Sequence, residues 1–151
     1  PGSNYYSVSE YCKLLLNGDT IEKIDPISAA KSMAKHAKSA LEGSENLRHE
    51  GQDNQELKYT LDDIEALGYL GLYYSDKIQA ATALELYRRT GKKQHQDNAV
   101  TLLQKAAVTW KKYSRKSKEM YRPQMLGRLC SLVDVQRFDS LAEMDALLPL
   151  E

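Results

Sequence analysis

Three acidic side chains lie close together in the sequence, at Asp62, Asp63 and Glu65. Paired carboxylates at such spacing could act as a general acid and a general base. They also follow Thr60, which we expect to cap a long helix, with an additional turn over residues 55–59 left open as the alternative. Negative charge in a first helical turn is stabilised by the backbone dipole. Because this helix-start role accounts for all three, and no G-x-S-x-G, P-loop or dinucleotide motif accompanies them, we assign no catalytic residue.

The histidines and cysteines show no metal-binding pattern. His36, His49 and His95 do not form an H-E-x-x-H motif or any pair at i,i+4 spacing, and Cys12 and Cys130 lie far apart. We therefore predict no metal and no cofactor. Two interpretations of the cysteines stay open: two small buried residues, which the absence of a spacing pattern favours, or a disulfide if the first and last helices touch.

Tyrosine is unusually frequent, with ten Tyr against one Phe and one Trp. A tyrosine hydroxyl needs a polar partner, so Tyr favours half-buried sites and binding surfaces. Tyr69 and Tyr73 are neighbours at i,i+4 on a helix, and Trp110 lies on another expected helix. We predict these three as candidate contacts for a sugar or a protein partner. The alternative is core lining with the hydroxyls at the rim.

Basic residues are concentrated in one stretch although the net charge is zero. Residues 88–122 carry 11 Lys and Arg against 2 Asp and Glu, whereas residues 1–87 carry 8 against 14. Candidate anion contacts within the stretch are Lys111, Lys112, Arg115, Lys116 and Lys118. A basic helix can bind phosphate, or it can neutralise acidic neighbours. We favour neutralisation and rank nucleic acid low as a partner, because no nucleic-acid-binding signature is present.

These candidate side chains are positioned by helices. Strand-type alternation is nearly absent, and the content of Ala, Leu, Lys, Glu and Gln is typical of helices. The range Thr60–Thr90 has no proline and is followed by Gly91, and Leu67–Tyr74 is apolar or aromatic on nearly every side. A helix that is apolar all round must be surrounded by other helices. We therefore predict an all-α fold with this long apolar helix (about 60–90) at its centre, and we interpret Gly68 and Gly71 as notches for close packing.

Other helix boundaries follow from caps and breakers. Ser7 and Glu10 form a capping box, and Asp25 precedes Pro26 at a favourable first helical position. We expect an up-and-down bundle of about five helices. Besides the central helix, these are expected over residues 7–17, over 26 to a point between 43 and 51, over 94–121, and from 139 or 140 to 148, with 126–135 either a short helix or extended.

Length and composition predict one domain. The chain has 151 residues, which suffices for a hydrophobic core without a disulfide or metal. We interpret residues 1–6 as a tag remnant and disordered lead, and residues 7–151 as a single helical-bundle domain. No apolar run approaches the roughly 20 residues of a membrane span, so we predict none.

One pattern resembles part of a tetratricopeptide repeat, a helical protein-interaction unit: Leu67-x2-Leu70-Gly71-x2-Tyr74-x8-Ala83-x3-Tyr87. The chain departs from that repeat in one important respect. The repeat needs a turn near residues 77–80, and Lys77-Ile78-Gln79-Ala80-Ala81 contains no helix breaker. We interpret the likeness as a pattern of apolar and small residues that packed helices share in general.

A longer stretch, Lys58–Pro123, resembles the helical C-terminal region of large bacterial secreted glycosidase-like proteins of the α-glucuronidase or hexosaminidase-like kind. The residues that carry the likeness are Tyr59-Thr60-Leu61-Asp62-Asp63, Leu86-Tyr87-Arg88-Arg89-Thr90-Gly91, Trp110-Lys111-Lys112-Tyr113 and Tyr121-Arg122-Pro123. The resemblance implies an accessory bundle attached to a catalytic barrel, in a protein that handles polysaccharide in the periplasm or outside the cell.

The leading expectation is therefore a non-catalytic accessory domain of a multidomain carbohydrate-active, glycoside hydrolase-like protein. Its partners would be other domains of its parent chain, with carbohydrate as a second candidate. The alternatives are a stand-alone tetratricopeptide-like protein-interaction module and, ranked lower, an anion or nucleic-acid binder that uses residues 88–122. The chain by itself is not expected to be an enzyme, because no nucleophile, base and orienting group can be grouped.

Overall fold

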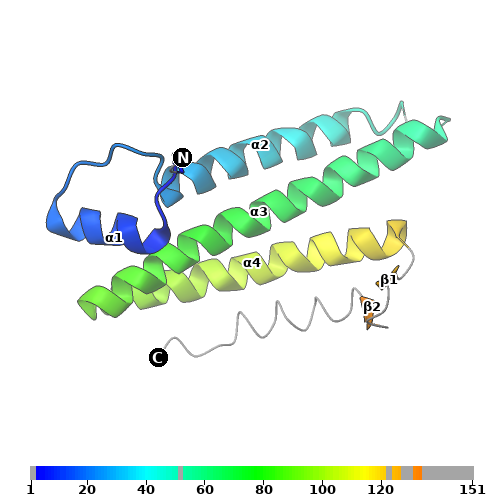
Figure 1. The fold of residues 1–151 in the computed structure, drawn as a ribbon. Helices are drawn as coiled ribbons and strands as arrows, with labels where there is room; N and C mark the ends of the chain where they lie inside the picture. The colour runs from blue at the N-terminus through cyan, green and yellow to red at the C-terminus, as the bar shows by residue number, and fades with distance from the viewer. Residues whose placement is uncertain (1–2, 51–52, 122–123, 127–130, 134–151) are drawn as a thin grey trace.

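Four α-helices and one short hairpin make up the computed structural model, which describes residues 3–50, 53–121, 124–126 and 131–133 (Figure 1). Helices α2, α3 and α4 run up-and-down, with α3 between the other two, and α1 lies near the C-terminal end of α3. The bounds are α1 Val8–Asn17, α2 Pro26–Asn46, α3 Gln55–Thr90 and α4 Lys93–Met120, with β1 Gln124–Leu126 antiparallel to β2 Ser131–Val133. The prediction of an all-α bundle is confirmed for the helical part of the chain.

Local signals set the ends of α1 and α2 as predicted. The Ser7 hydroxyl accepts from the backbone N–H of Glu10, and the Glu10 carboxylate accepts from the backbone N–H of Ser7, so the capping box is formed. Gly18 ends α1 in the left-handed region, with φ of 76°. Asp25 caps α2 by accepting from the backbone N–H of Ser28, next to Pro26 at the first helical position.

Helix α3 begins before Thr60, with the additional turn over residues 55–59 that the sequence left open. The helix begins at Gln55, where Asn54 caps it by accepting from the backbone N–H of Leu57, and not at Thr60. Asn is among the strongest capping residues, and good helix formers such as Gln55 and Glu56 follow it, so an earlier start gains extra helical turns. The end at Thr90 is as predicted, with Gly91 in the left-handed region.

The structure describes four helices, so the prediction of about five is not confirmed. The expected fifth helix, up to residue 148, lies outside the described ranges. The ambiguous stretch 126–135 is extended where it is described, in the hairpin of β1 and β2. Helix α3 continues without a break through residues 77–80, so the turn that a tetratricopeptide repeat requires is absent from it.

Small side chains form most of the contact between the helices. The buried residues include Ala30, Ala37 and Ser44 of α2, Ala66, Ala80 and Ala83 of α3, and Ala99, Ala106, Ser114 and Ser117 of α4. Small residues allow helix axes to approach closely, and every methyl group that is buried then contributes to dense packing. The Ser75 hydroxyl adds a link between helices, since it donates to the Ala30 carbonyl at 2.8 Å.

Helix α3 is central, but the all-round apolar burial expected for it is not confirmed. Leu67 and Tyr74 have exposed fractions of 65% and 49%. Polar positions such as Asp62 and Asp76 are instead buried. The interpretation of the glycines is confirmed on the α2 side, where a Cβ on Gly68 would lie 2.7 Å from Leu41 Cγ and one on Gly71 would lie 3.1 Å from Ala37 Cβ.

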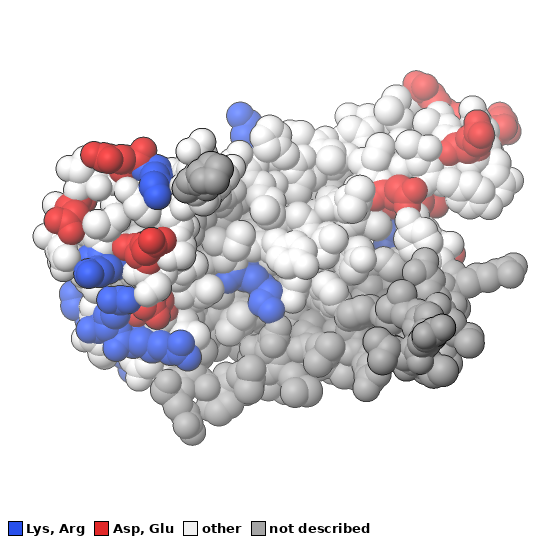
Figure 2. Space-filling view, in the orientation of Figure 1, with Lys and Arg blue, Asp and Glu red and all other residues white. Residues whose placement is uncertain are grey.

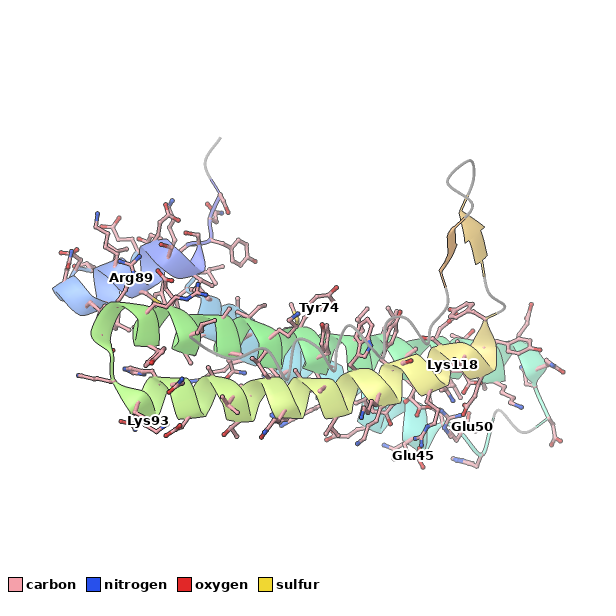
Figure 3. All side chains as sticks on the ribbon, turned by 90° about the horizontal axis from the view of Figure 1, so that it is seen from below. Glu45, Glu50, Tyr74, Arg89, Lys93 and Lys118 are labelled. Atoms are coloured by element: carbon pink, nitrogen blue, oxygen red, sulfur yellow. The ribbon has the colours of Figure 1, made fainter. Side chains whose placement is uncertain are left out.

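Helix α1 is held against the end of α3 by a few specific contacts. The Cys12 thiol is fully buried as a free cysteine and donates to the Thr82 carbonyl at 3.7 Å. Arg89, at the α3 terminus beside α1 in Figure 3, donates to the Ser9 hydroxyl at 2.9 Å. Cys130 lies outside the described residues, so the disulfide alternative is not tested from that side.

The segment before α1 has more structure than expected. Residues 1–6 were predicted to be a disordered lead, yet the backbone N–H of Tyr6 donates to the Ile24 carbonyl and the N–H of Ile24 donates to the Asn4 carbonyl, both at 3.0 Å. These bonds tie the N-terminal segment to the entry of α2. Residues 1–2 lie outside the described part of the chain.

Candidate functional site

Two of the predicted aromatic contacts, Tyr73 and Trp110, meet at the seam between α3 and α4, and Tyr69 precedes Tyr73 by one turn of α3. The rings of Tyr73 and Trp110 lie 4.7 Å apart between centroids, with Tyr74 next to Tyr73 at 5.2 Å and Tyr113 next to Trp110 at 5.1 Å. All three pairs are tilted, which is a favourable geometry for aromatic rings. We call Tyr69, Tyr73, Tyr74, Trp110 and Tyr113 the aromatic cluster.

Exposure differs strongly within the aromatic cluster. Tyr73 retains an exposed fraction of only 8%, whereas Tyr69 and Trp110 are half-buried and Tyr74 is exposed. Tyr73 therefore packs in the core and supports Trp110, and any contact with a ligand would fall to the more exposed rings. Figure 3 shows Tyr74 projecting from α3.

Cations lie over two of these rings. Lys77 Nζ is 5.4 Å from the centroid of the Tyr73 ring, and Lys112 Nζ is 5.7 Å from that of Tyr69. Burial, followed by the nearby Glu65 carboxylate, raises the pKa of Tyr69, so its hydroxyl stays protonated at neutral pH. The cluster thus offers ring faces and protonated phenols.

A second cluster, which we call the ion cluster, consists of Arg48, Asp62, Glu65 and Lys116. Lys116 Nζ lies 2.6 Å from Asp62 Oδ1 and 3.0 Å from Glu65 Oε2. Arg48 Nη1 lies 3.0 Å from Asp62 Oδ1, and its Nη2 also pairs with Glu65. Since Arg48 follows α2, the two carboxylates belong to α3 and Lys116 belongs to α4, the ion cluster joins three helices at one end of the bundle.

The charges of the ion cluster hold one another in the ionised state. Burial alone would raise the pKa of Asp62, but hydrogen bonds from Lys116 and Arg48 outweigh it and hold that pKa below its ordinary value. Burial opposes the charge of Lys116, whose pKa is nevertheless raised by the hydrogen bonds to Asp62 and Glu65. A fixed, compensated set of charges suits structural linkage and not proton transfer.

The expected role of the acidic residues in the first turn of α3 is therefore wrong. Because α3 begins at Gln55, Asp62, Asp63 and Glu65 lie beyond its first turn, where the helix dipole no longer stabilises them appreciably. Asp62 and Glu65 serve as ion-pair partners, and Asp63 accepts a hydrogen bond from the Tyr121 hydroxyl.

The predicted anion contacts do not form one common surface. Lys116 has a side chain only 15% exposed and is committed to the ion cluster, and Lys112 lies over Tyr69. Lys111, Arg115 and Lys118 are exposed. The structure thus supports internal neutralisation for Lys116, the favoured interpretation of the basic stretch.

An apolar groove with a volume of about 830 Å³ lies between α2 and α3. We call it the α2–α3 groove. Its walls include Tyr5 and Ile24 from the N-terminal segments, Met33 and His36 from α2, and Leu67 from α3, and its floor includes Gly68 and Gly71. Among the described residues that line it, none is Lys, Arg, Asp or Glu. On the face that Figure 2 draws, charged side chains gather towards the two ends of the helices, with few over the centre.

Neither a metal site nor a membrane-spanning helix is found among the described residues. Among the described residues there is no group of three or more His, Cys, Asp and Glu side chains that could hold a metal ion. None of the described helices combines the length and the apolar character needed to span a bilayer.

Comparison with known proteins adds no family assignment: no family model, curated protein or solved structure matches the chain.

Several residues of these sites were absent from the sequence prediction. Arg48 lies in the range 43–51, where the second helix was expected to end, and nothing in the sequence indicates that it reaches α3. Tyr113 could have been found, since it follows Trp110 at i,i+3 spacing, whereas Tyr74 directly follows Tyr73 and neighbours at i,i+1 do not share a helix face. The α2–α3 groove depends on how two helices and the N-terminal segment meet. Gly68 and Gly71, predicted as packing notches, were one indication of it in the sequence.

Proposed function

We propose that this chain is a non-catalytic accessory helical domain of a multidomain carbohydrate-active, glycoside hydrolase-like protein of the periplasm or the exterior of a bacterial cell. The α2–α3 groove is the observation that carries the proposal. It is large, apolar and without formal charge, which is typical of a surface that contacts protein. The largely buried ion pairs of the ion cluster link helices within this domain.

The proposed occupant of the groove is the domain that precedes this one in the parent chain. Tyr5 lines the groove, and its neighbours Asn4 and Tyr6 are hydrogen-bonded to the backbone of Ile24. A domain joined ahead of Asn4 is therefore tethered within a few residues of the groove. Each residue of such a tether spans at most about 3.5 Å, so a linker of a few residues keeps the preceding domain close to the α2–α3 groove. A short tether gives a high effective concentration, so even a modest apolar contact would stay docked.

The first test is the native polypeptide in its source cells. Fractionated extract is blotted with an antibody raised against this domain. A band several times larger than 17.1 kDa, outside the cytoplasm, is expected. A cytoplasmic band near 17.1 kDa would contradict the proposal and would favour the stand-alone interaction module, with the same groove as its binding surface. The anion-binding alternative ranks below both, because Lys116 is already neutralised.

Carbohydrate is the second proposed partner, at the more exposed rings of the aromatic cluster. Ring faces stack on the apolar faces of sugars, and Tyr74 and Trp110 lie on either side of the buried Tyr73. Trp110 is the only tryptophan, so its fluorescence reports directly on this surface. Titration with neutral xylan and chitin oligosaccharides should change the emission of the wild type and leave that of Tyr74→Ala much less affected. Unchanged emission in the wild type would remove this partner.

A further inference from the structure

A second cavity lies where α1, the C-terminal part of α3 and the first turns of α4 meet, with Ile27 at the start of α2 on its border. Its volume is about 280 Å³. Helix α1 contributes Tyr11, α3 contributes Gln79 and Thr82, and α4 contributes His95 and Asn98. It shares no lining residue with the α2–α3 groove and none with the aromatic cluster. Five polar side chains from three helices thus border one small space.

These polar groups retain hydrogen-bonding capacity. Within the described part of the chain, the Tyr11 hydroxyl, the His95 ring and the Asn98 amide have no side-chain hydrogen-bond partner, and Gln79 uses its Nε2 to donate to Ser75. Burial, followed by the charge of Asp25, raises the pKa of Tyr11, so its hydroxyl remains a donor. Together the groups offer both donors and acceptors.

The rest of the lining determines which ligand would fit. The described residues that line the cavity include no Lys, Arg, Asp or Glu, and Leu15, Leu86 and Leu102 supply apolar wall. Moving an ion into such a space without a compensating charge is costly, so a charged ligand is disfavoured. A neutral molecule with several hydroxyl groups and one apolar face matches both kinds of wall. The volume equals that of about nine liquid waters, enough for a molecule the size of a monosaccharide.

We propose that the cavity between α1, α3 and α4 binds a small neutral polyhydroxylated ligand of monosaccharide size. His95 and Asn98 donate to and accept from its hydroxyl groups, Tyr11 donates a further hydrogen bond, and the leucines contact its apolar face. This inference does not depend on the proposed accessory role, because it concerns a different part of the surface.

The test is a titration of the folded chain followed by backbone amide NMR. The probes are glucose, galactose, mannose, xylose and N-acetylglucosamine, with glucuronate and glucosamine as charged counterparts of similar shape. We expect saturable shifts of the amides of His95 and Asn98 with at least one neutral sugar. The loss of one neutral hydrogen bond should weaken binding about 3- to 10-fold in His95→Ala and in Asn98→Ala. His36→Ala, a histidine change in the α2–α3 groove, is the matched control and should bind as the wild type does.

Each outcome bears on the proposal. The absence of saturable shifts at His95 and Asn98 with all five neutral sugars would overturn it, as would undiminished binding in both α4 variants. Equal binding of glucuronate or glucosamine would overturn the assignment of a neutral ligand. Shifts confined to Tyr74 and Trp110 would overturn this cavity as the site while supporting carbohydrate contact at the aromatic cluster. His95→Gln keeps a polar side chain and serves in place of His95→Ala if that variant loses its helical circular dichroism.

Discussion

Asp62 is the residue through which the ion cluster connects different helices. Its Oδ1 accepts from Lys116 of α4 and from Arg48 after α2, and its side chain is only 12% exposed. Partly buried charges of this kind are stabilised by their partners, and removal of one leaves the others undercompensated.

We predict that Asp62→Asn lowers the free energy of unfolding by about 1–3 kcal/mol, because Lys116 and Arg48 lose a charged acceptor in a partly buried site. Urea unfolding followed by circular dichroism measures this change. Asp97→Asn is the matched control, since Asp97 pairs with Lys93 on an exposed face of α4. That change should stay within about 0.5 kcal/mol. Equal effects of the two substitutions would contradict the structural role of the ion cluster.

The same residue predicts a dependence on pH. The pKa of Asp62 is lowered in the folded chain, where hydrogen bonds from Lys116 and Arg48 outweigh burial. Its contribution is therefore present above the unfolded pKa, near 3.9, and is lost as pH falls through the lower folded pKa. The stability difference between wild type and Asp62→Asn should be greatest near neutral pH and should shrink below about pH 4. A difference that grew in acid would refute this assignment.

Glycine substitutions test the packing notch on α3. A Cβ at Gly68 would lie 2.7 Å from Leu41 Cγ, whereas a Cβ at Gly43 of α2 would have no neighbour within 4 Å. Gly68→Ala should therefore destabilise the chain by about 1–3 kcal/mol through overpacking. Gly43→Ala should stabilise it by up to about 1 kcal/mol, because Ala is the better helix former. Thermal or urea unfolding compares them, and a stabilised Gly68→Ala would show that α2 and α3 are not closely packed there.

At the scale of elements, α1 is attached to the bundle through one buried cysteine and a small set of polar contacts. Cys12 is fully buried, and burial, followed by the Glu85 charge, raises the pKa of its thiol. Both properties suppress reaction, because the thiolate is the reactive form and must be accessible.

Labelling of Cys12 with a thiol reagent should therefore report the detachment of α1. In a Cys130→Ser background, we expect Cys12 to react slowly in the folded chain and rapidly in denaturant. Arg89→Ala removes the side chain that donates to Ser9 and should speed labelling, by up to about 10-fold for one lost hydrogen bond. Rapid labelling of the unmodified folded chain would show that α1 is not packed as described.

At the scale of the whole molecule, the row of α2, α3 and α4 leaves one flank of α3 open as the α2–α3 groove. A closed four-helix arrangement would bury Leu67, whereas this one leaves it 65% exposed beside Gly68. The proposed function places another domain against it.

A matched pair of substitutions tests that docking in the parent polypeptide. Leu67→Asp places a charge in the groove, and Val108→Asp places one on α4 at a position 58% exposed and outside the groove. Leu67→Asp should weaken docking by about 1.5–3 kcal/mol, roughly the value of burying one leucine, and should speed proteolytic release of this domain. Val108→Asp should leave release unchanged. Equal rates in both variants would remove the groove as the interdomain contact.

The sequence by itself determined the features that depend on neighbouring residues. The capping box of Ser7 and Glu10, the Asp25-Pro26 start and the left-handed Gly91 are local, so the ends of α1, α2 and α3 that they set were predicted. The continuity of α3 through residues 77–80 was also predicted, because no breaker occurs there. The start of α3 shows the limit of such reasoning: the sequence offers two caps, Asn54 and Thr60, and leaves the turn between them open, whereas in the structure the longer helix forms.

Only the tertiary structure decided which side chains meet. Arg48 and Lys116 lie 68 positions apart and yet bind the same carboxylates. Tyr11, Gln79 and His95 border one cavity from three helices, although no spacing in the sequence links them. Helical periodicity fixes which face of a helix is apolar, but the rotation and order of the packed helices fix what that face contacts. The aromatic cluster, the ion cluster, the α2–α3 groove and the second cavity all arise from the way in which the helices pack.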